Sequence, residues 1–306
     1  MISFLGIISY TIEMIIISIG GGLGNQMFEY AFYLMMKEIY PNVEIKLDIM
    51  HTFGYAHNGY EIEKIFGLKS EECSLNELMK LSDIYPIDGK NYRFYSILYR
   101  MRRILLGRKS CFIQLEDSSR YEERLLKLES GKSYYLLGVF ANYRYFSSIS
   151  QKIRELYVFP DIDEKNFEWK KFIENTCSVS IHIRRGDYLE WGIDIVTDSF
   201  YYKAIKKIRN MVKEECFFFV FTDDSEYVKK AYKNIDNLRI VEGNTKENSY
   251  RDMQLMSLCK HNIIANSTFS FWGAFLNKNP EKIVIAPNVP FTGCKELFVC
   301  DDWIIV

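Results

Sequence analysis

The chain has 306 residues, of which 48% are hydrophobic and 16% aromatic, and its formal net charge is −1 at pH 7. This length allows two domains of roughly 150 residues that each bury a core, and the composition is that of a folded protein, not a disordered one. The balanced charge excludes a general nucleic-acid binder, which needs a clear basic excess for contacts to the phosphate backbone.

The N-terminal segment predicts a strand, a glycine-rich loop and a helix. The strand is expected at 14–19 and the helix at about 25–40, followed by a proline, and a second strand lies near 43–47. The first nineteen residues are apolar, but they lack the basic start of a signal peptide and contain Glu13. We therefore do not interpret this segment as a signal peptide.

The glycine-rich loop opens onto the start of that helix. Free backbone N–H groups and the helix dipole at such a position favour an anion or a sugar hydroxyl. The loop does not fit a dinucleotide-binding fingerprint, because Met27 stands where the third glycine of GxGxxG would allow close helix packing. Asn25 is either a plain helix cap or a substrate contact. The candidate substrate-binding residues of the loop are Gly22, Gly24, Asn25 and Gln26.

The stretch from 50 to 135 shows no clean repeat, and we predict helices near 74–81 and 92–106. No run of eighteen or more uninterrupted apolar residues occurs there or later, so a membrane-spanning helix is not expected. The segment 92–109 mixes basic residues with Tyr, Phe, Ile and Leu, as an interfacial amphipathic helix would, and an ordinary helix with one basic face explains it equally well. Its basic residues are Arg93, Arg100, Arg102, Arg103, Arg108 and Lys109.

From residue 177 onward, short β-branched or aromatic runs alternate with longer amphipathic stretches, which is typical of a parallel sheet covered by helices. Apolar residues spaced three and four apart between Phe200 and Val212 mark one face of a helix. The segment 159–161 is the expected hinge before this sheet. The strands are predicted near 178–183, 216–222, 238–241, 262–265 and 282–286.

The first of these strands runs into the sequence HIRRGDY, which begins at His182. Ligands of open α/β sheets bind beyond the carboxyl ends of strands, where this motif lies. Arginine is charged at every working pH and meets phosphate oxygens in bidentate fashion, so Arg184 and Arg185 could neutralise a diphosphate without a metal. A surface loop with a salt-bridged Arg–Asp pair is the alternative interpretation.

Two more polar groups follow later strands. Asp223 and Asp224 close the strand near 216–222, where they either serve a ribose or brace Arg185. Hydroxyl side chains before the last predicted helix can hydrogen-bond phosphates, whereas the aromatic residues behind them are typical of core packing. The candidate residues of this segment are Asn266, Ser267, Thr268 and Ser270.

The glycine loop, the arginine motif and the segment NSTFSFWGA, in this order and spacing, resemble the α-1,2-fucosyltransferases of glycosyltransferase family 11. The resemblance covers nearly the whole chain from Met14, which matches the family's usual start, so the true start codon is either Met1 or Met14. Further support comes from 60–66, from Gly138 with 145–146, and from 221–224.

This resemblance implies an α/β fold of two facing Rossmann-like domains, the GT-B glycosyltransferase architecture. The domain at 1–160 would receive the acceptor, and the domain at 161–306 would bind GDP-fucose. The resemblance also implies that Arg184 is the main β-phosphate contact, with Arg185 either structural or directed at fucose, and that His182 contacts the nucleotide base.

Asp252 resembles a carboxylate that related fucosyltransferases use on guanine. A carboxylate accepts both the ring N–H and the exocyclic amine of guanine. The alternative is an aspartate at a helix start, favoured there by the helix dipole.

The implied reaction is an inverting displacement, in which an acceptor hydroxyl attacks the anomeric carbon of fucose through an oxocarbenium-like state. Asp187 and Glu190 are candidates for the general base, although Asp187 could instead fix Arg184, and the departing phosphate could take the proton. No metal is expected, because the arginines make one redundant. Asp161 and Asp163 follow a proline in the linker and are read as a solvated turn.

The implied product is an α-1,2-fucosylated galactoside in a bacterial surface polysaccharide or lipid-linked oligosaccharide. Seven scattered cysteines without a CxxC pair indicate reduced thiols in a cytoplasmic protein, for which a peripheral position on the inner face of the membrane stays open. The family's aromatic–Gln pair after Gly138 is replaced by Val139-Phe140-Ala141-Asn142, so altered acceptor recognition is expected there. A fucosyltransferase of another linkage, such as α-1,6, and a non-catalytic carbohydrate-binding protein are the rival hypotheses, and a nicotinamide-dependent oxidoreductase comes last.

Overall fold

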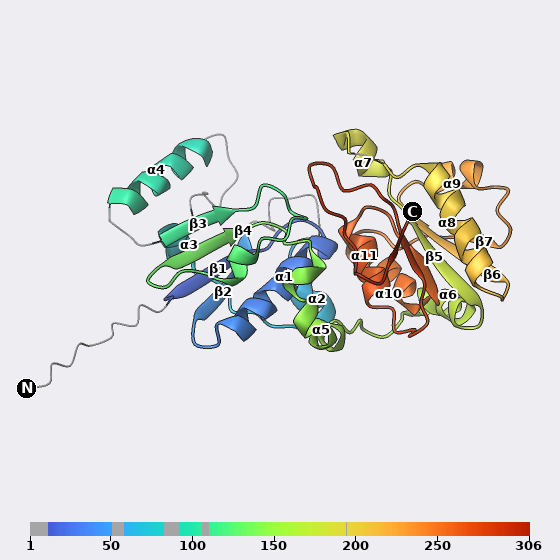
Figure 1. Ribbon diagram of the computed structural model, residues 1–306, viewed down its shortest axis with the longest axis horizontal. Coiled ribbons are helices and arrows are strands. Elements are labelled where there is room, and N and C mark those ends of the chain that lie inside the picture. The colour runs from blue at the N-terminus through green and yellow to red at the C-terminus, as the bar shows by residue number, and fades with distance from the viewer. Residues whose placement is uncertain (1–11, 51–57, 83–91, 106–109, 194) are drawn as a thin grey trace, which may run out of the picture.

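The computed structural model describes residues 12–50, 58–82, 92–105, 110–193 and 195–306, which form two parallel β-sheets with helices packed around them (Figure 1). The sheets lie side by side along the long axis of the molecule, one built from the N-terminal half of the chain and one from the C-terminal half. These are the two facing Rossmann-like units that the sequence predicts. Among the described residues, no helix is long and apolar enough to cross a membrane.

The first sheet has the order β2-β1-β4-β3, and every pair in it is parallel. The predicted first strand, helix and second strand are all present, because their apolar residues lie where a buried strand and an amphipathic helix need them. Strands β3 and β4 were not predicted: both have five residues, and four of the five side chains of β4 are buried, so no polar–apolar alternation marks it. The elements are β1 (Met14–Ser18), α1 (Leu23–Ile39), β2 (Glu44–Asp48), α2 (Ile62–Phe66), α3 (Leu75–Leu81), α4 (Tyr92–Leu105), β3 (Ser110–Gln114), β4 (Ser133–Leu137) and α5 (Ser150–Leu156).

The second sheet has the order β10-β9-β8-β5-β6-β7 and is also parallel throughout. Its five predicted strands are present within two residues of the expected bounds, whereas β10, a two-residue strand at the C-terminus, was not predicted. The elements are α6 (Glu164–Glu174), β5 (Cys177–Ile183), α7 (Gly186–Trp191), α8 (Asp198–Met211), β6 (Cys216–Thr222), α9 (Ser225–Ala231), β7 (Leu238–Val241), α10 (Tyr250–Leu258), β8 (His261–Ile263), α11 (Thr268–Phe275), β9 (Val284–Ala286) and β10 (Ile304–Ile305).

The two halves share a hydrophobic core where α1 packs against α11 (Figure 1). The ring of Phe28 on α1 lies 4.7 Å from the ring of Phe271 and 4.9 Å from that of Trp272, measured between centroids. Contacts of this kind contribute both buried apolar area and a favourable ring geometry. The chain itself crosses from one half to the other between α5 and α6, in the segment where the hinge was predicted.

Candidate functional site

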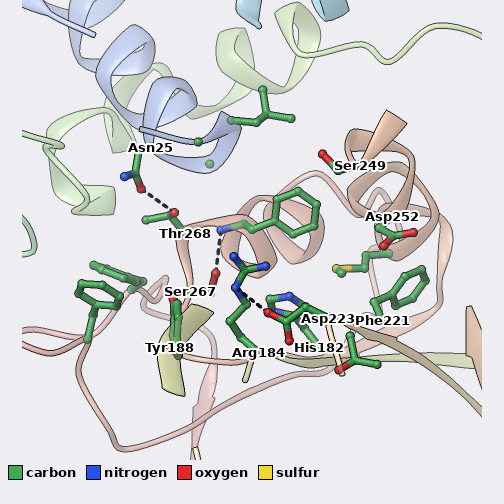
Figure 2. Close-up of a pocket in the computed structure, with 18 of the residues that line it drawn as sticks. Asn25, His182, Arg184, Tyr188, Phe221, Asp223, Ser249, Asp252, Ser267 and Thr268 are labelled. Carbon is green, nitrogen blue, oxygen red and sulfur yellow. Dashed lines mark hydrogen bonds and ion pairs between the residues drawn. The ribbon is translucent and has the colours of Figure 1, made fainter. Parts of the chain in front are cut away.

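A cavity of about 790 Å³ lies between the two halves, at the carboxyl ends of strands from both sheets (Figure 2). Its volume is in the range of sites that hold a small-molecule ligand. Of the residues that the sequence singles out, the cavity is lined by Gly22, Gly24, Asn25, His182, Arg184, Asp223, Asp252, Ser267 and Thr268. The folded chain thus brings all three motifs to one site.

The arginine motif contributes one positively charged side chain to the cavity, that of Arg184. It follows the last residue of β5, and Figure 2 shows its side chain pointing toward Ser267 and Thr268 at the start of α11. Its Nε lies 3.2 Å from Oδ2 of Asp223, which fixes the guanidinium and leaves it about one third exposed. A positioned, partly exposed guanidinium beside a helix N-terminus is a favourable place for phosphate oxygens.

Arg185 is directed elsewhere. Its guanidinium stacks 3.4 Å from the ring centroid of Tyr227, and its Nε lies 3.5 Å from Oδ2 of Asp224. Asp224 also accepts a hydrogen bond from the backbone N–H of Tyr227 and so caps α9. The side chain of Arg185 is not part of the cavity lining, which agrees with the structural alternative for this residue and not with a contact to fucose. Its backbone N–H still serves the site by donating to Oδ1 of Asp223 at 2.9 Å.

The glycine loop meets α11 head to head. The hydroxyl of Thr268 donates to Oδ1 of Asn25 at 2.7 Å, and the indole N–H of Trp272 donates to the carbonyl of Gly24 at 2.9 Å. A Cβ atom on Gly24 would lie 2.7 Å from the backbone N of Phe269, closer than real Cβ contacts occur. Glycine is therefore required at position 24 because the starts of two helices, both with positive dipole ends, converge there.

Three residues that were predicted to contact the substrate have hydrogen-bond partners inside the protein. The amide of Gln26 donates to the carbonyls of Gly21 and Gly59 and accepts from the N–H of Glu61, so it braces the loop behind the cavity. The hydroxyl of Ser270 accepts the N–H of Ala265 within the turn before α11. Both side chains are buried, as is that of Asn266, and none of the three lines the cavity, so their contact with a ligand stays a prediction: Gln26, Asn266 and Ser270.

His182 lines the cavity from β5 and is 5% exposed. Burial, and next the positive charge of Arg184, lower the pKa of its imidazole to about 3, so the ring is neutral near pH 7. Its Nδ1 is buried and has no hydrogen-bond partner among the described residues. A neutral ring nitrogen in this state is available to a polar atom of a ligand in the cavity.

Asp252 lines the other end of the cavity, in the first turn of α10. Burial raises the pKa of its carboxyl from the ordinary 3.8 to about 7, against the lowering effect of a hydrogen bond from Asn244 Nδ2 at 2.8 Å. The carboxyl is thus ionised only above neutral pH until an additional donor stabilises its charge. A ligand that brings N–H donors would supply that stabilisation.

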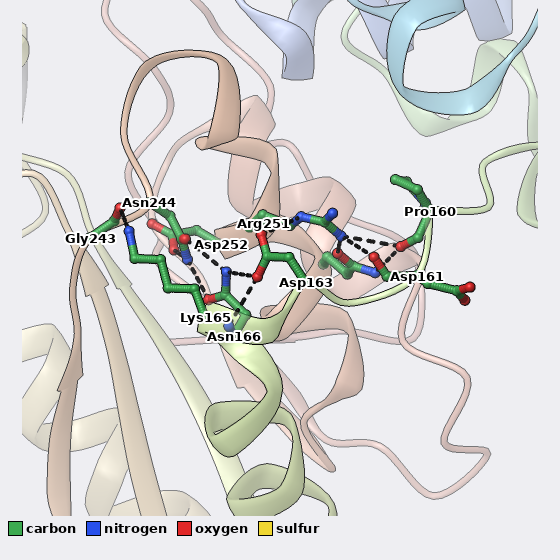
Figure 3. A network of polar contacts seen from close by, with 10 residues as sticks. Pro160, Asp161, Asp163, Lys165, Asn166, Gly243, Asn244, Arg251 and Asp252 are labelled. Atoms are coloured by element: carbon green, nitrogen blue, oxygen red, sulfur yellow. Dashed lines mark hydrogen bonds and ion pairs between the residues drawn. The ribbon is translucent and has the colours of Figure 1, made fainter.

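A polar network holds Asn244 in place and ties the linker between the halves to α10 (Figure 3). The amides of Asn244 and Asn166 exchange hydrogen bonds of 2.9 and 3.0 Å, and Asn166 in turn is held by Asp163, which caps α6. Arg251 donates to the carbonyl of Asp161 at 2.7 Å and reaches that of Pro160 at 3.2 Å. Asp161 and Asp163 therefore lie in the linker, as expected, and Asp163 has a structural task.

The site also contains residues that the sequence analysis missed. Glu61 and Glu116 line the cavity from the N-terminal half, and burial raises the pKa of Glu61. Glu116 is exposed and follows the end of β3, an element that was not predicted. Apolar walls come from residues that were not predicted as site residues: Val139, Ala141, Tyr188, Phe291 and Phe298.

The two candidates for the general base, Asp187 and Glu190, both belong to α7. Glu190 is exposed and does not line the cavity, so its position does not favour a role at the reacting atoms. The side chain of Asp187 lies outside the described part of the structure. Within the described ranges, no group of three or more His, Cys, Asp or Glu side chains is placed to hold a metal ion.

Comparison with known proteins places this geometry in context. Residues 114–305 match the family model described as Glycosyl transferase family 11. The chain is 32% identical to an alpha-1,2-colitosyltransferase of Escherichia coli over 287 residues, which are 90% of this chain and 91% of that protein. It is 29% identical to the O-antigen biosynthesis glycosyltransferase WbnK of Escherichia coli, over 94% of this chain and 98% of that protein.

Among solved structures, the fucosyltransferase NodZ from Bradyrhizobium superposes with a TM-score of 0.50 at 13% identity, covering 86% of this chain and 91% of that one. At this level of identity, the likeness supports the two-sheet fold alone.

Proposed function

This chain belongs to glycosyltransferase family 11, and from that premise we propose that it transfers L-fucose from GDP-fucose to the 2-hydroxyl of a terminal galactose, with inversion and without a metal. The observation that carries the proposal is the pairing of two features in one cavity: a guanidinium fixed by Asp223 near the starts of α1 and α11, and the partly buried carboxyl of Asp252 with its raised pKa. The first suits a diphosphate, and the second suits a base with adjacent N–H donors.

The donor would lie along the second sheet. Its guanine would place the ring N–H and exocyclic amine on Asp252, which Asn244 orients, and the unpaired ring nitrogen of His182 would face a polar atom of the nucleotide. Its diphosphate would accept hydrogen bonds from the guanidinium of Arg184 and the hydroxyl of Ser267, both of which line the cavity. The neutral state of His182 near pH 7 makes it a hydrogen-bonding group there and not a second cation.

In the proposed step, the acceptor oxygen forms a bond to the anomeric carbon of fucose while the bond from that carbon to the β-phosphate oxygen breaks. The electron pair leaves with GDP, and Arg184 neutralises the charge that develops on the phosphate. An interaction of this kind, stronger in the transition state than in the ground state, lowers the barrier by a few kcal/mol. The hydroxyl proton passes to a base; Asp187 remains a candidate, and Glu116 joins it from the acceptor side.

The acceptor would enter from the first sheet. Val139, Ala141 and Phe298 offer apolar contact to the faces of a sugar ring, and Ser118 and Glu116 offer polar partners for its hydroxyls. The altered sequence after Gly138 therefore contributes to this wall. We propose a bacterial surface polysaccharide or its lipid-linked precursor as the acceptor, consistent with the name of the similar WbnK protein, and a cytoplasmic location beside the membrane.

A second donor is favoured by one observation, the 32% identity over 90% of the chain to an alpha-1,2-colitosyltransferase. Colitose differs from fucose by the absence of one ring hydroxyl, so the arginine and guanine contacts would serve either donor. The choice depends on whether the cavity places a polar group against that hydroxyl.

The test is to incubate the purified protein with GDP-fucose or GDP-colitose and a panel of β-galactosides, with and without EDTA, and to measure GDP release and product linkage. The proposal expects EDTA-resistant release and an α-1,2 product, with a higher kcat/KM for GDP-fucose. A higher value for GDP-colitose would transfer the assignment to that donor, and an α-1,6 product would correct the linkage. Sugar binding that is unaffected by Arg184→Ala and unaccompanied by GDP release would favour a carbohydrate-binding protein.

A further inference from the structure

Helix α4 carries a concentrated stripe of exposed apolar side chains. Among the described residues, thirteen large hydrophobic side chains are exposed, and six of them belong to this one helix. They stand at i, i+3, i+4, i+7, i+10 and i+11, so at 3.6 residues per turn they fall within an arc of roughly 120°. The six residues, with exposures from 44% to 80%, are Phe94, Ile97, Leu98, Met101, Ile104 and Leu105.

The stripe is not the inner face of a helix that packs on the sheet. None of the described side chains of α4 is buried, and the helix contacts α3 at the end of the molecule farthest from the second sheet (Figure 1). A monomeric protein that stays in water rarely leaves so many neighbouring apolar side chains exposed. An exposed apolar stripe of this kind is typical of an interaction surface.

The charges of α4 indicate what covers it. The helix contains Arg93, Arg100, Arg102 and Arg103 and no acidic residue. At about 100° per residue, Arg100 and Arg102 fall on opposite borders of the apolar stripe, and both are exposed. Arginines in this position can keep their charged ends at the level of phosphate groups while their stems extend along apolar surface. A second copy of α4 against the stripe would bring like charges together instead.

We propose that α4 is a membrane-docking helix, which lies in the plane of an anionic phospholipid bilayer with its stripe in the outer acyl region and with Arg100 and Arg102 at the headgroup phosphates. The helix has 14 residues and is about 21 Å long, too short for the roughly 30 Å hydrocarbon core, so it lies on the bilayer and does not span it. Only the purpose of this docking, access to a lipid-linked acceptor, rests on the proposed function; the lipid contact does not.

The test is sedimentation of the full chain with vesicles of phosphatidylcholine alone or with about one third phosphatidylglycerol, without any nucleotide sugar. We expect binding to the anionic vesicles. Leu98→Glu with Met101→Glu should weaken it at least tenfold, and Arg100→Gln with Arg102→Gln by about 25-fold, at about fivefold per arginine. The matched control, Val158→Glu with Met211→Glu, changes exposed apolar residues outside α4 and should bind as the parent does.

Three outcomes overturn the proposal: the parent does not bind anionic vesicles, the α4 variants bind as well as the parent, or light scattering shows a dimer that the α4 variants abolish. Quenching of tryptophan fluorescence by brominated lipid provides a second test, which does not depend on loss of binding. Ile104→Trp should be quenched by brominated lipid in the bound state, and Met211→Trp should not; equal quenching of the two contradicts the docking geometry. Because no step requires GDP-fucose, failure of fucose transfer and failure of membrane docking are separate results.

Discussion

Substitution of Asp252 by Asn tests the assignment of the nucleotide base. In the free protein, the pKa of the Asp252 carboxyl is about 7, so this group changes charge within the working range of most assays. Only the ionised form accepts both N–H donors of guanine. Donor affinity should therefore be present above pH 7 and be lost as the pH falls through 7, by a factor of about 1 + 10^(7 − pH), which is roughly twofold at pH 7 and about tenfold at pH 6.

Asp252→Asn should bind GDP-fucose more weakly than the parent, and its affinity should not change between pH 6 and 8. Asn keeps one acceptor and turns an amide donor toward the guanine donors, so one hydrogen bond to a charged group is lost. That loss is worth about 1.5–3 kcal/mol, or about tenfold to 150-fold in Kd at pH 8. Isothermal titration with GDP-fucose between pH 6 and 8 measures both effects, because this sugar diphosphate has no phosphate group that titrates near neutrality. The imidazole of His182, with a pKa of about 3, does not titrate in this range either.

The inosine analogue of the donor, which lacks the exocyclic amine, serves as the matched ligand. The parent protein should bind it more weakly than GDP-fucose, and Asp252→Asn should show a much smaller difference between the two. If the parent affinity is flat from pH 6 to 8 and the variant binds GDP-fucose within about threefold of the parent at pH 8, Asp252 does not read guanine, and the reasoning from its burial is refuted.

Three further predictions follow from the same site. Arg184→Ala should lower kcat by about 100-fold to 1000-fold with little change in the unfolding midpoint. Arg185→Ala loses contacts outside the cavity, so it should keep kcat within about tenfold of the parent and lower the unfolding midpoint. Equal losses of kcat in the two variants would contradict this division of roles. Gly24→Ala should reduce both activity and stability, the latter by about 1–3 kcal/mol, because its Cβ meets backbone at 2.7 Å, while Gly20→Ala has open space and should match the parent in denaturant unfolding. The raised pKa of Asp252 gives a contribution to stability that is complete below about pH 4 and is lost as the pH rises through 7. Between pH 5 and 8, the free energy of unfolding of Asp252→Asn in urea titrations should therefore rise by about 1–3 kcal/mol relative to that of the parent. No rise would mean that solvent in the cavity offsets the burial of the carboxyl.

The sequence allowed prediction of the parts of the fold in which local pattern and tertiary role agree. The buried strand β5 is continuously apolar or small, ends in the arginine motif, and is followed by a helix with regular three-and-four spacing, so both its bounds and its position at the site were predictable. Strands β3 and β4 carry no such pattern. Strand β4 pairs with β1, more than a hundred residues away in the chain, and β3 pairs only with β4 among the described strands, so neither position in the sheet is encoded locally.

The site shows the same division. The presence of Arg184 and Asp252 in the cavity was predictable from the family resemblance, whereas a charged side chain at a strand end or a helix start left a structural role equally open. The roles of Gln26 and Ser270 were not, because a buried amide or hydroxyl has the same sequence appearance whether it binds a ligand or a backbone group. Glu116 was missed for a different reason, since it reaches the cavity only through the unpredicted strand β3.

The contact between the glycine loop and α11 joins the two helix starts that form the anion site. Gly24, Asn25 and Thr268 join two motifs that are separated by more than 240 residues, and Phe28 extends this junction into the shared core. The two helix starts that face the cavity are therefore fixed with respect to each other by backbone contact and by packed rings. Rigid cores have few alternative arrangements of similar energy. The anion site can thus be preorganised before the donor arrives, which is the condition under which fixed dipoles lower a barrier without having to reorient during the reaction.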